Sequence, residues 1–383
     1  MTRAQFIFSL GSGSALLVAG AALAVSGVGD WGLFWVGGLI SGVALSGFRT
    51  QARVPAPLPI RVAGEREGGL MQLDIGVAFF VLGALARLVR ADIQFPRSLY
   101  QSLTLFLLIA IGLKGGVALR EHADISLAPQ AIAVILLGLA LPLIAFPLLS
   151  RIGQMSRENA AAIAAHYGSV SVGTYAVAVA ILESRDIPYE AYFPLFVVLL
   201  EMPAIAVGLA LARRSDGGLD RGALLHEICC NQGVVLMTGA LLIGYWAGSG
   251  VAPIMPLFGD LFHGVLALFL LEMGMVAASR LPAIRQVAPF MTAFGVLMPL
   301  IGAGLGGLLG LALGFSTGGI ALLAALGGSA SYIAVPAVMR TALPDANHGL
   351  SIAASLGITF PFNVLVGIPL YITGAGWLVA ATG

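Results

Sequence analysis

The sequence predicts an all-α integral membrane protein made of two five-span repeats of opposite orientation, with two further apolar spans before them. Three observations support this prediction. The chain of 383 residues is 59% hydrophobic and 10% charged, whereas soluble domains carry about 25% charged residues. Continuously apolar runs of about 20 residues recur, which is the length needed to cross a hydrocarbon core about 30 Å thick. Finally, the two halves of the chain resemble each other.

Twelve apolar spans are expected. They lie near residues 13–28, 32–48, 72–89, 97–119, 128–150, 159–182, 191–212, 229–248, 255–279, 286–313, 317–339 and 349–380. A polar linker rich in proline and arginine separates the first two spans from the other ten. The expected divisions are an N-terminal extension (1–70), a first repeat (71–212), a short cytoplasmic linker (213–228) and a second repeat (229–383).

An internal repeat is indicated by three short alignments at nearly one offset. Gly168-Ser169-Val170-Ser171 aligns with Gly328-Ser329-Ala330-Ser331, "GGVAL" at 115–119 with "GMVAA" at 274–278, and "EMPAI" at Glu201 with "TFPFN" at Thr359. Three matches in order favour a true repeat over chance. Because five spans is an odd number, the second copy enters the membrane from the opposite side. Such an inverted repeat is the common plan of secondary transporters.

The arginines in the loops predict the orientation of the ten-span core. One side carries Arg87, Arg90, Arg97, Arg151, Arg157, Arg213, Arg214, Arg221, Arg280, Arg285 and Arg340, and the other carries Arg120 and Arg185. Since cytoplasmic loops are enriched in arginine and lysine, the first side is predicted to face the cytoplasm of an inner membrane and both core termini the periplasm. For the extension, a cleaved signal peptide over residues 1–24, which we disfavour, and translation from Met71 are alternatives.

Two stretches break the apolar pattern: "AAHYGSVSVGTYAVA" at 164–178 and "ALGGSASYIAVPAVM" at 325–339. Helices break inside a membrane only where protein or a cavity replaces the lost hydrogen bonds. The residues that can interrupt a helix here are Gly168, Gly173, Gly327, Gly328 and Pro336. The N-terminal end of a half-helix suits an anion, and unwound carbonyls and hydroxyls suit a small cation. We expect two halves of one binding site, although small residues also line ordinary helix contacts.

Four motifs resemble the sodium-dependent bicarbonate transporter family of the SbtA type over about residues 71–383. They are "IGLKGGVALR", "HYGSVSVGTYAVAVAILESRDIPYEAYFPLFVVLLEMPAI", "LEMGMVAASRL" and "GGSASYIAVPAVMRTALPDANHGLSIAASLGITFP". The resemblance implies a ten-span 5+5 fold that holds bicarbonate between two crossed, broken helices. It also implies sodium as the driving ion, a homotrimer, and in some members a PII-like regulator on the cytoplasmic face.

By position, the resemblance also implies the site residues. The substrate-binding set is Ser169, Ser171, Gly173, Thr174, Ser329, Ser331 and the backbone around Tyr332. A sodium ion is expected near Ser171, Thr174 and Ser331, and no other cofactor is implied. Glu201 occupies the place of an acidic residue before proline and is a candidate cation ligand or proton carrier.

Two residues depart from the family pattern. Tyr332 stands in place of an acidic residue, and Lys114, the only lysine of the chain, in place of a small hydroxyl residue. A charge in mid-membrane costs about 2.5–3.5 kcal/mol and marks a functional site. One hypothesis is that the Lys114 ammonium replaces a coupling cation; the alternative is an ion pair with Glu272, its near-equivalent in the second repeat. His166 is either a proton relay, given an unperturbed pKa of about 6.5, or a structural histidine.

The residues themselves support a secondary transporter that imports a small anion, and the resemblance favours bicarbonate. The alternatives are a proton-coupled or uncoupled carrier of another small anion such as a short monocarboxylate, and a membrane scaffold without transport. A channel is disfavoured because it would not need an inverted repeat for alternating access. An enzyme is disfavoured because the five histidines are scattered and no H-E-x-x-H cluster occurs. No nucleic-acid partner is expected.

Overall fold

The computed structural model describes residues 74–122, 127–212, 231–286 and 289–382. Residues 73–93 and 103–383 belong to one compact unit, and every contact described below lies within it. The segment 94–102, which includes the first residues of α4, is assigned to a separate unit. The two apolar spans expected at 13–28 and 32–48 lie outside the described residues.

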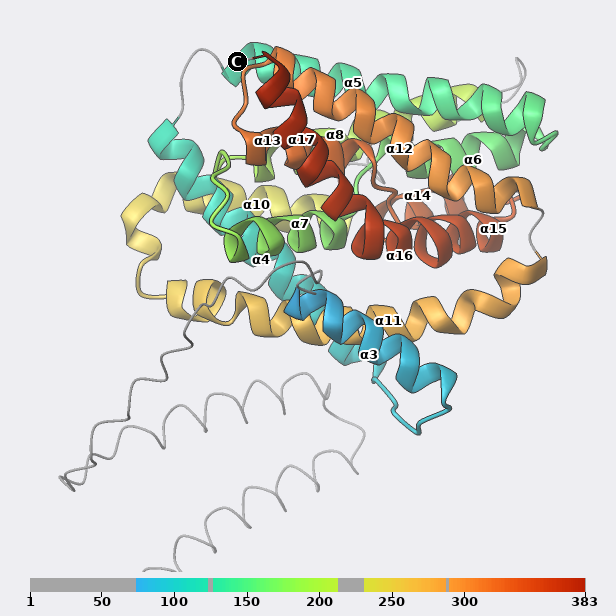
Figure 1. Ribbon diagram of the computed structural model, residues 1–383, viewed down its shortest axis with the longest axis horizontal. Coiled ribbons are helices and arrows are strands. Elements are labelled where there is room, and N and C mark those ends of the chain that lie inside the picture. The colour runs from blue at the N-terminus through green and yellow to red at the C-terminus, as the bar shows by residue number, and fades with distance from the viewer. Residues whose placement is uncertain (1–73, 123–126, 213–230, 287–288, 383) are drawn as a thin grey trace, which may run out of the picture. The chain divides into compact units, whose positions relative to one another are not determined.

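The described chain is helical (Figure 1). The helices of its first half are α3 (Ile75–Leu88), α4 (Arg97–His122), α5 (Leu127–Pro147) with a π-helical end (Leu148–Ile152), α6 (Arg157–Gly168), α7 (Val172–Ser184) and α8 (Pro194–Ala212). Those of its second half are α10 (Gln232–Ala247), α11 (Phe262–Gln286), α12 (Pro289–Ala312), α13 (Thr317–Gly327), α14 (Ala334–Ala342), α15 (His348–Ile352), α16 (Phe360–Phe362) and α17 (Ile368–Thr382). Short 3₁₀ and π segments follow α10, at Gly248–Val251 and Pro256–Asp260, and π-helical turns flank α16, at Ala353–Thr359 and Asn363–Gly367.

Within the described residues, eight helices are long and apolar enough to cross a membrane. Two shorter apolar helices, Ile75–Leu88 and Thr317–Gly327, fall where further spans are predicted. The prediction of an all-α, multi-pass membrane protein is therefore confirmed. α3 covers about 21 Å at 1.5 Å per residue, less than the hydrocarbon thickness.

Several predicted boundaries differ from the structure. The span expected at 255–279 begins at Phe262, because residues 248–260 form separate short turns around Pro256. The span expected at 159–182 is two helices, α6 and α7, and the one expected at 317–339 is α13 and α14. These last two differences are the helix breaks that the Gly-Ser motifs predict.

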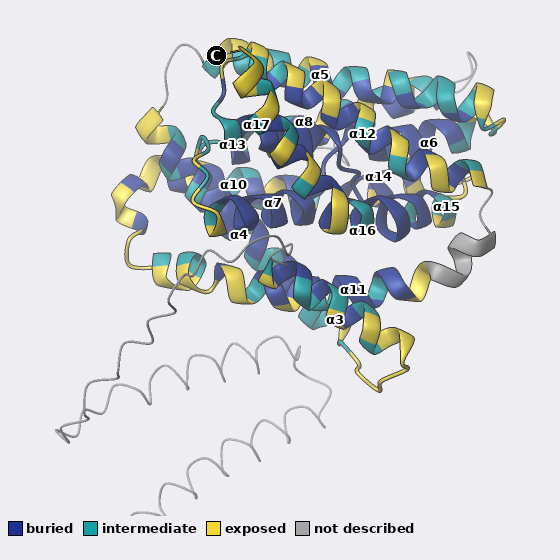
Figure 2. Cartoon of the chain, viewed as in Figure 1, coloured by how far each residue is buried: buried dark blue, intermediate teal, exposed yellow. Residues whose placement is uncertain are grey.

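The broken helix α6–α7 is the most enclosed span. Every residue of its most apolar 18-residue window is buried, whereas the windows of the other seven long spans are 33–56% buried. Figure 2 shows α6, α7 and α13 largely in the colour of buried residues, while α5, α12 and α17 alternate between buried and exposed positions. A membrane helix that faces protein on all sides is suited to lining an internal site, because its broken backbone is shielded from lipid.

Glycines allow the supporting helices to cross closely. A Cβ on Gly83 of α3 would overlap the carbonyl of Leu271 on α11, and one on Gly274 of α11 would overlap the carbonyl of Phe80 on α3. Gly116 of α4 and Gly244 of α10 face each other's helix in the same reciprocal way. Gly83 and Gly244, like Gly116 and Gly274, are separated by about 160 residues, close to the offset of the Gly-Ser motifs.

Candidate functional site: two adjoining helix breaks

The first break lies between α6 and α7. α6 ends at Gly168, Ser169 and Ser171 have extended backbone angles, and α7 begins at Val172. The Ser171 hydroxyl caps α7 by accepting the N–H of Thr174 at 3.1 Å. The first N–H groups of a helix have no acceptor within it, so those of Val172 and Gly173 point out of the start of α7. This end of α7 therefore offers two backbone donors and the positive end of a helix dipole.

The second break runs from Gly328 to Ile333, between α13 and α14. No side chain caps the first residue of α14, and the Ser331 hydroxyl accepts the N–H of Val335 at 3.5 Å. The sequence suggested that Pro336 could interrupt a helix, but in the structure it does not. It is the third residue of α14, where its missing N–H would have no intrahelical acceptor anyway.

Hydrogen bonds join the two breaks directly. The N–H of Ser171 donates to the Ser329 hydroxyl at 3.0 Å, and the N–H of Ser331 donates to the carbonyl of His166 at 2.8 Å. The His166 ring returns a bond from Nδ1–H to the carbonyl of Ser331 at 2.6 Å. Because a carbonyl can only accept, this contact places a proton on Nδ1. His166 therefore ties the second break to α6, which favours the structural role over the proton relay.

Polar atoms without partners lie around the first break. The Ser169 hydroxyl, the Thr174 hydroxyl and His166 Nε2 are buried and have no hydrogen-bond partner among the described residues. Ser169 and Thr174 are each 1% exposed. A buried polar atom left unpaired costs about 1–3 kcal/mol, and such atoms are rare in native proteins. The Ser169 and Thr174 hydroxyls, one on each side of the start of α7, indicate a place for a small polar guest.

Aromatic rings close the start of α7. A Cβ on Gly173 would lie 2.5 Å from the Tyr332 hydroxyl and 3.0 Å from the Phe269 ring, so a larger residue there would require the Tyr332 side chain to shift. The Tyr332 ring packs edge-on against Phe360 with centroids 5.3 Å apart. Tyr332, which is 9% exposed, is thus a wall of the site and brings its hydroxyl to the first break. Phe269 and Phe360 were not predicted as site residues.

Two buried hydrogen-bond chains support the breaks from the C-terminal helices. Tyr371 donates to Asn363 at 2.8 Å, and the Asn363 amide donates to the carbonyl of Gly328 at 2.8 Å. Tyr167 and Thr359 share a bond of 2.8 Å, and Thr359 donates to the carbonyl of Gly295 at 2.7 Å. These residues were not predicted from the sequence. The alignment of Thr359 with Glu201 was the one available signal for this group.

Glu201 lies on the face of α8 that covers α6. On α8, Ala204 and Gly208 contact Gly168 and Ala165 of α6. Glu201 shares this face one turn nearer to the end of α6, because residues three apart on a helix are neighbours. Its side chain is 4% exposed, and in the part of the chain that the structure describes its Oε2 has no hydrogen-bond partner. A buried carboxyl group therefore lies at the level of the first break.

Lys114 and Glu272 belong to α4 and α11, and neither is part of the two breaks themselves. The Lys114 Nζ is 4.7 Å from the centre of the Phe262 ring, and among the described residues it forms no ion pair. Glu272 lies on the same helix as Phe262, about 15 Å further along it at 1.5 Å per residue. Both side chains are partly buried. The Lys114–Glu272 pair considered from the sequence is thus not formed.

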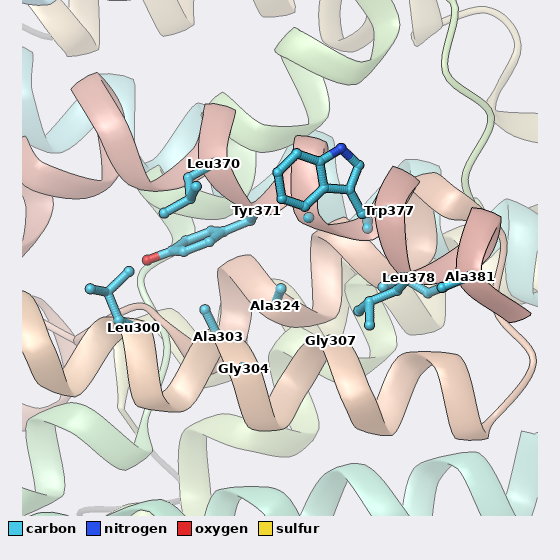
Figure 3. A pocket seen from close by; sticks show the side chains of 13 residues that line it. Leu300, Ala303, Gly304, Gly307, Ala324, Leu370, Tyr371, Trp377, Leu378 and Ala381 are labelled. Carbon is cyan, nitrogen blue, oxygen red and sulfur yellow. The ribbon is translucent and has the colours of Figure 1, made fainter.

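An apolar groove of about 490 Å³ lies between α12, α13 and α17. Figure 3 shows Leu300 and Ala303 on one side and Leu370 and Trp377 on the other, with the Tyr371 ring reaching between them. The groove offers almost no polar groups and is not suited to an anion. Its connection to the site is the Tyr371 hydroxyl, which begins the hydrogen-bond chain to Gly328.

The arrangement can hold a small anion at the start of α7, with backbone N–H groups, two free hydroxyls and the aromatic wall around it. No curated protein is significantly similar to the chain. Residues 76–376 match the sequence profile of the Na+-dependent bicarbonate transporter superfamily, and this match covers most of the chain, including both breaks. The chain therefore belongs to the Na+-dependent bicarbonate transporter superfamily.

Proposed function

We propose that the protein is a secondary active transporter that imports bicarbonate through the two adjoining helix breaks. The observation that carries the proposal is the set of unpaired groups at one place. The Ser169 and Thr174 hydroxyls lack partners, and the N–H groups of Val172 and Gly173 point out of the start of α7. Bicarbonate has acceptor oxygens for these N–H groups and a hydroxyl that can donate to a serine or threonine oxygen.

We also propose that residues 71–212 and 229–383 are inverted repeats whose breaks meet at the bilayer midplane. The reciprocal glycine contacts, Gly83 with Gly274 and Gly116 with Gly244, support this proposal. Such a pair of repeats allows alternating access, in which one unit rocks against the other around a fixed site.

The proposed membrane orientation keeps the arginine-rich loops in the cytoplasm. Hydrogen bonds between the ends of helices support the grouping into two sides. Arg157 donates to the carbonyl of Leu211 at 2.7 Å, and the N–H of Asn347 donates to Asn159 at 2.6 Å, all at the predicted cytoplasmic side. At the other side Arg120 donates to the carbonyl of Trp246 at 2.6 Å. A homotrimer and a cytoplasmic PII-like regulator are further proposals from the family resemblance.

Sodium is the coupling ion that family membership favours. Two oxygens of the expected sodium site are already used, because Ser171 caps α7 and Ser331 accepts the N–H of Val335. The Thr174 hydroxyl is unused, and Tyr332 supplies no carboxylate. A second candidate is proton coupling, which the buried Glu201 carboxyl favours because a lone buried carboxyl group is costly to ionise. The transported anion in this case is bicarbonate or a short monocarboxylate.

The test is uptake of labelled bicarbonate into proteoliposomes, with an inward sodium gradient, with an inward proton gradient, and with neither, against protein-free liposomes. We expect saturable uptake that one of the two gradients drives above equilibrium. Uptake of formate or acetate in place of bicarbonate would transfer the proposal to a monocarboxylate. If none of these anions enters faster than into protein-free liposomes, the proposed function is wrong.

A further inference from the structure

A small pocket around Lys114 lies apart from the helix breaks. Its volume is about 110 Å³, and its lining includes Lys114, Tyr175, Glu183, Tyr189 and Phe262. A single water needs about 10–15 Å³ of such space. The Lys114 pocket therefore has room for an anion of a few heavy atoms and its remaining water. It contains the only lysine of the chain, in a helix that crosses the membrane.

The ammonium group in this pocket has no hydrogen-bond acceptor among residues 74–122, 127–212, 231–286 and 289–382. Lys114 Nζ lies over the Phe262 ring, and a cation on an aromatic face keeps its N–H donors available for an anion. Glu183 shares the pocket, but its oxygens are used elsewhere: Oε1 accepts from the Tyr189 hydroxyl at 2.8 Å, and Oε2 is 3.2 Å from Nε2 of His263. Burial and the nearby Glu183 carboxylate raise the pKa of Tyr189, which keeps its hydroxyl a donor.

The pocket is connected to the site by two helices. Tyr175 lines the pocket, and its backbone N–H donates to the carbonyl of Ser171 at the start of α7. On α11, Phe262 lines the pocket, and two helical turns later Phe269 contacts Gly173. Two turns correspond to about 10 Å. An anion in the Lys114 pocket is therefore one short step from the first break.

We infer that the Lys114 pocket is a second site for a small monovalent anion, which the anion occupies on its way between the arginine-poor side and the start of α7. The inference rests on the proposed function. The ammonium attracts anions over several ångströms because the surrounding protein has a low dielectric constant. Glu183 weakens the attraction, which suits a transit site that must release its anion. This role replaces the hypothesis that Lys114 stands in for a cation at the breaks.

Because Lys114 is the only lysine, amine chemistry can report on this pocket directly. The test is reductive methylation with formaldehyde and cyanoborohydride of the purified full-length protein, followed by mass spectrometry of the Lys114 peptide. Bicarbonate, formate and acetate are compared with gluconate at constant pH and ionic strength. At twice its Kd an anion fills two thirds of the sites, so labelling of Lys114 should slow about threefold. The N-terminal α-amino group is the internal control, and its labelling should not change.

The double variant Ser169→Ala/Thr174→Val separates this inference from the proposed function. It removes hydroxyls from the first break and leaves the Lys114 pocket unchanged, so bicarbonate should still protect Lys114. Protection that disappears in this variant would mean that the anion acts from the break, which overturns the inference. Protection by formate but not by bicarbonate would uphold the pocket and contradict bicarbonate as substrate. If no small anion protects Lys114, the inference is wrong, whatever the uptake assay shows.

Transport kinetics give a second readout. Lys114→Met keeps the length of the side chain and removes the charge, and Lys114→Arg keeps the charge. We expect Lys114→Met to raise the KM for uptake about tenfold with the maximal rate retained, and Lys114→Arg to restore most of the affinity. A lower maximal rate with an unchanged KM in Lys114→Met would indicate a role in folding or conformational change and would contradict the inference.

Discussion

Ser169 and Ser329 occupy equivalent positions in the two Gly-Ser motifs, but within the described chain only the Ser329 hydroxyl forms hydrogen bonds. The Ser329 hydroxyl accepts the N–H of Ser171 at 3.0 Å and donates to the carbonyl of Leu326 at 2.8 Å. The Ser169 hydroxyl has no partner, although it is equally buried. One serine thus holds the two breaks together, and the other is available to a guest. The Ser329 hydroxyl therefore has a structural role, and the Ser169 hydroxyl is a candidate binding group.

The variant Ser329→Ala should destabilise the protein. It leaves the buried N–H of Ser171 without an acceptor, which costs about 1–3 kcal/mol. We expect a lower thermal unfolding temperature in detergent, together with reduced uptake because the two breaks lose their direct connection. A variant that unfolds at the wild-type temperature would show that the Ser329 hydroxyl is not the tie described here.

The variant Ser169→Ala should affect transport and leave stability unchanged or slightly improved. Removing an unpaired buried hydroxyl abolishes no bond and relieves a desolvation cost. A hydrogen bond to a charged ligand contributes about 1.5–3 kcal/mol, and each 1.4 kcal/mol is a factor of ten in affinity. We therefore expect the KM for bicarbonate to rise at least about tenfold. The check is the concentration dependence of uptake by proteoliposomes, and an unchanged KM would place the anion elsewhere.

The Gly-Ser motifs and the repeat offset predicted where the helices break, because glycine and serine in an apolar run are a local signal. The role of each serine was not predictable. The bond between Ser171 and Ser329 joins segments far apart in the chain, and its formation depends on how they cross. Asn363 and Thr359 were missed for a related reason: each is a single polar residue in an apolar run, and only the tertiary contacts give it a carbonyl to bind.

For Lys114 the sequence predicted that the residue is functional, but not which groups surround it. A lone intramembrane charge predicts function, and this signal is visible in the sequence. Whether the charge reaches the breaks, pairs with Glu272 or occupies its own pocket depends on the helix rotation of α4 and on Phe262 of α11. Neither is encoded in the local pattern around Lys114.

The variant Gly274→Ala should prevent the close crossing of α3 and α11. Its Cβ would overlap the backbone carbonyl of Phe80, which cannot move away as a flexible side chain could. Overpacking of this kind costs about 1–3 kcal/mol, and sometimes more. The expected results are a lower unfolding temperature and a lower yield of folded protein, measured by thermal unfolding and size-exclusion chromatography.

Gly304→Ala is the matched control for this variant. Gly304 lies on α12, and a Cβ there would meet no atom within 4 Å. Because alanine favours a helix over glycine by about 0.5–1 kcal/mol, Gly304→Ala should be as stable as the wild type or slightly more stable. A loss of stability equal to that of Gly274→Ala would refute the crossing argument.

The variant Glu201→Gln should uncouple transport from its driving ion. Its shape is nearly that of glutamate, but it can neither carry a proton nor offer a carboxylate to sodium. The first break keeps its hydroxyls and N–H groups, so the anion should still bind. We therefore expect exchange of labelled for unlabelled bicarbonate to continue, while accumulation against a gradient is lost. Thermal unfolding should be unaffected or slightly improved, because a buried carboxyl with an unpaired oxygen is replaced by a neutral amide.

Glu272→Gln is the comparison variant, since this carboxyl group is only half-buried on α11, one turn beyond Phe269, whereas Glu201 is buried. Glu272→Gln should accumulate bicarbonate like the wild type. The ion that Glu201 serves is then identified from the gradient that drives uptake in the wild type and loses its effect in Glu201→Gln. If a proton gradient alone drives uptake, and Glu201→Gln abolishes its effect, Glu201 is the proton carrier. If sodium drives uptake, the same variant should lose its sodium dependence. Gradient-driven accumulation that persists in Glu201→Gln would exclude this carboxyl group from coupling.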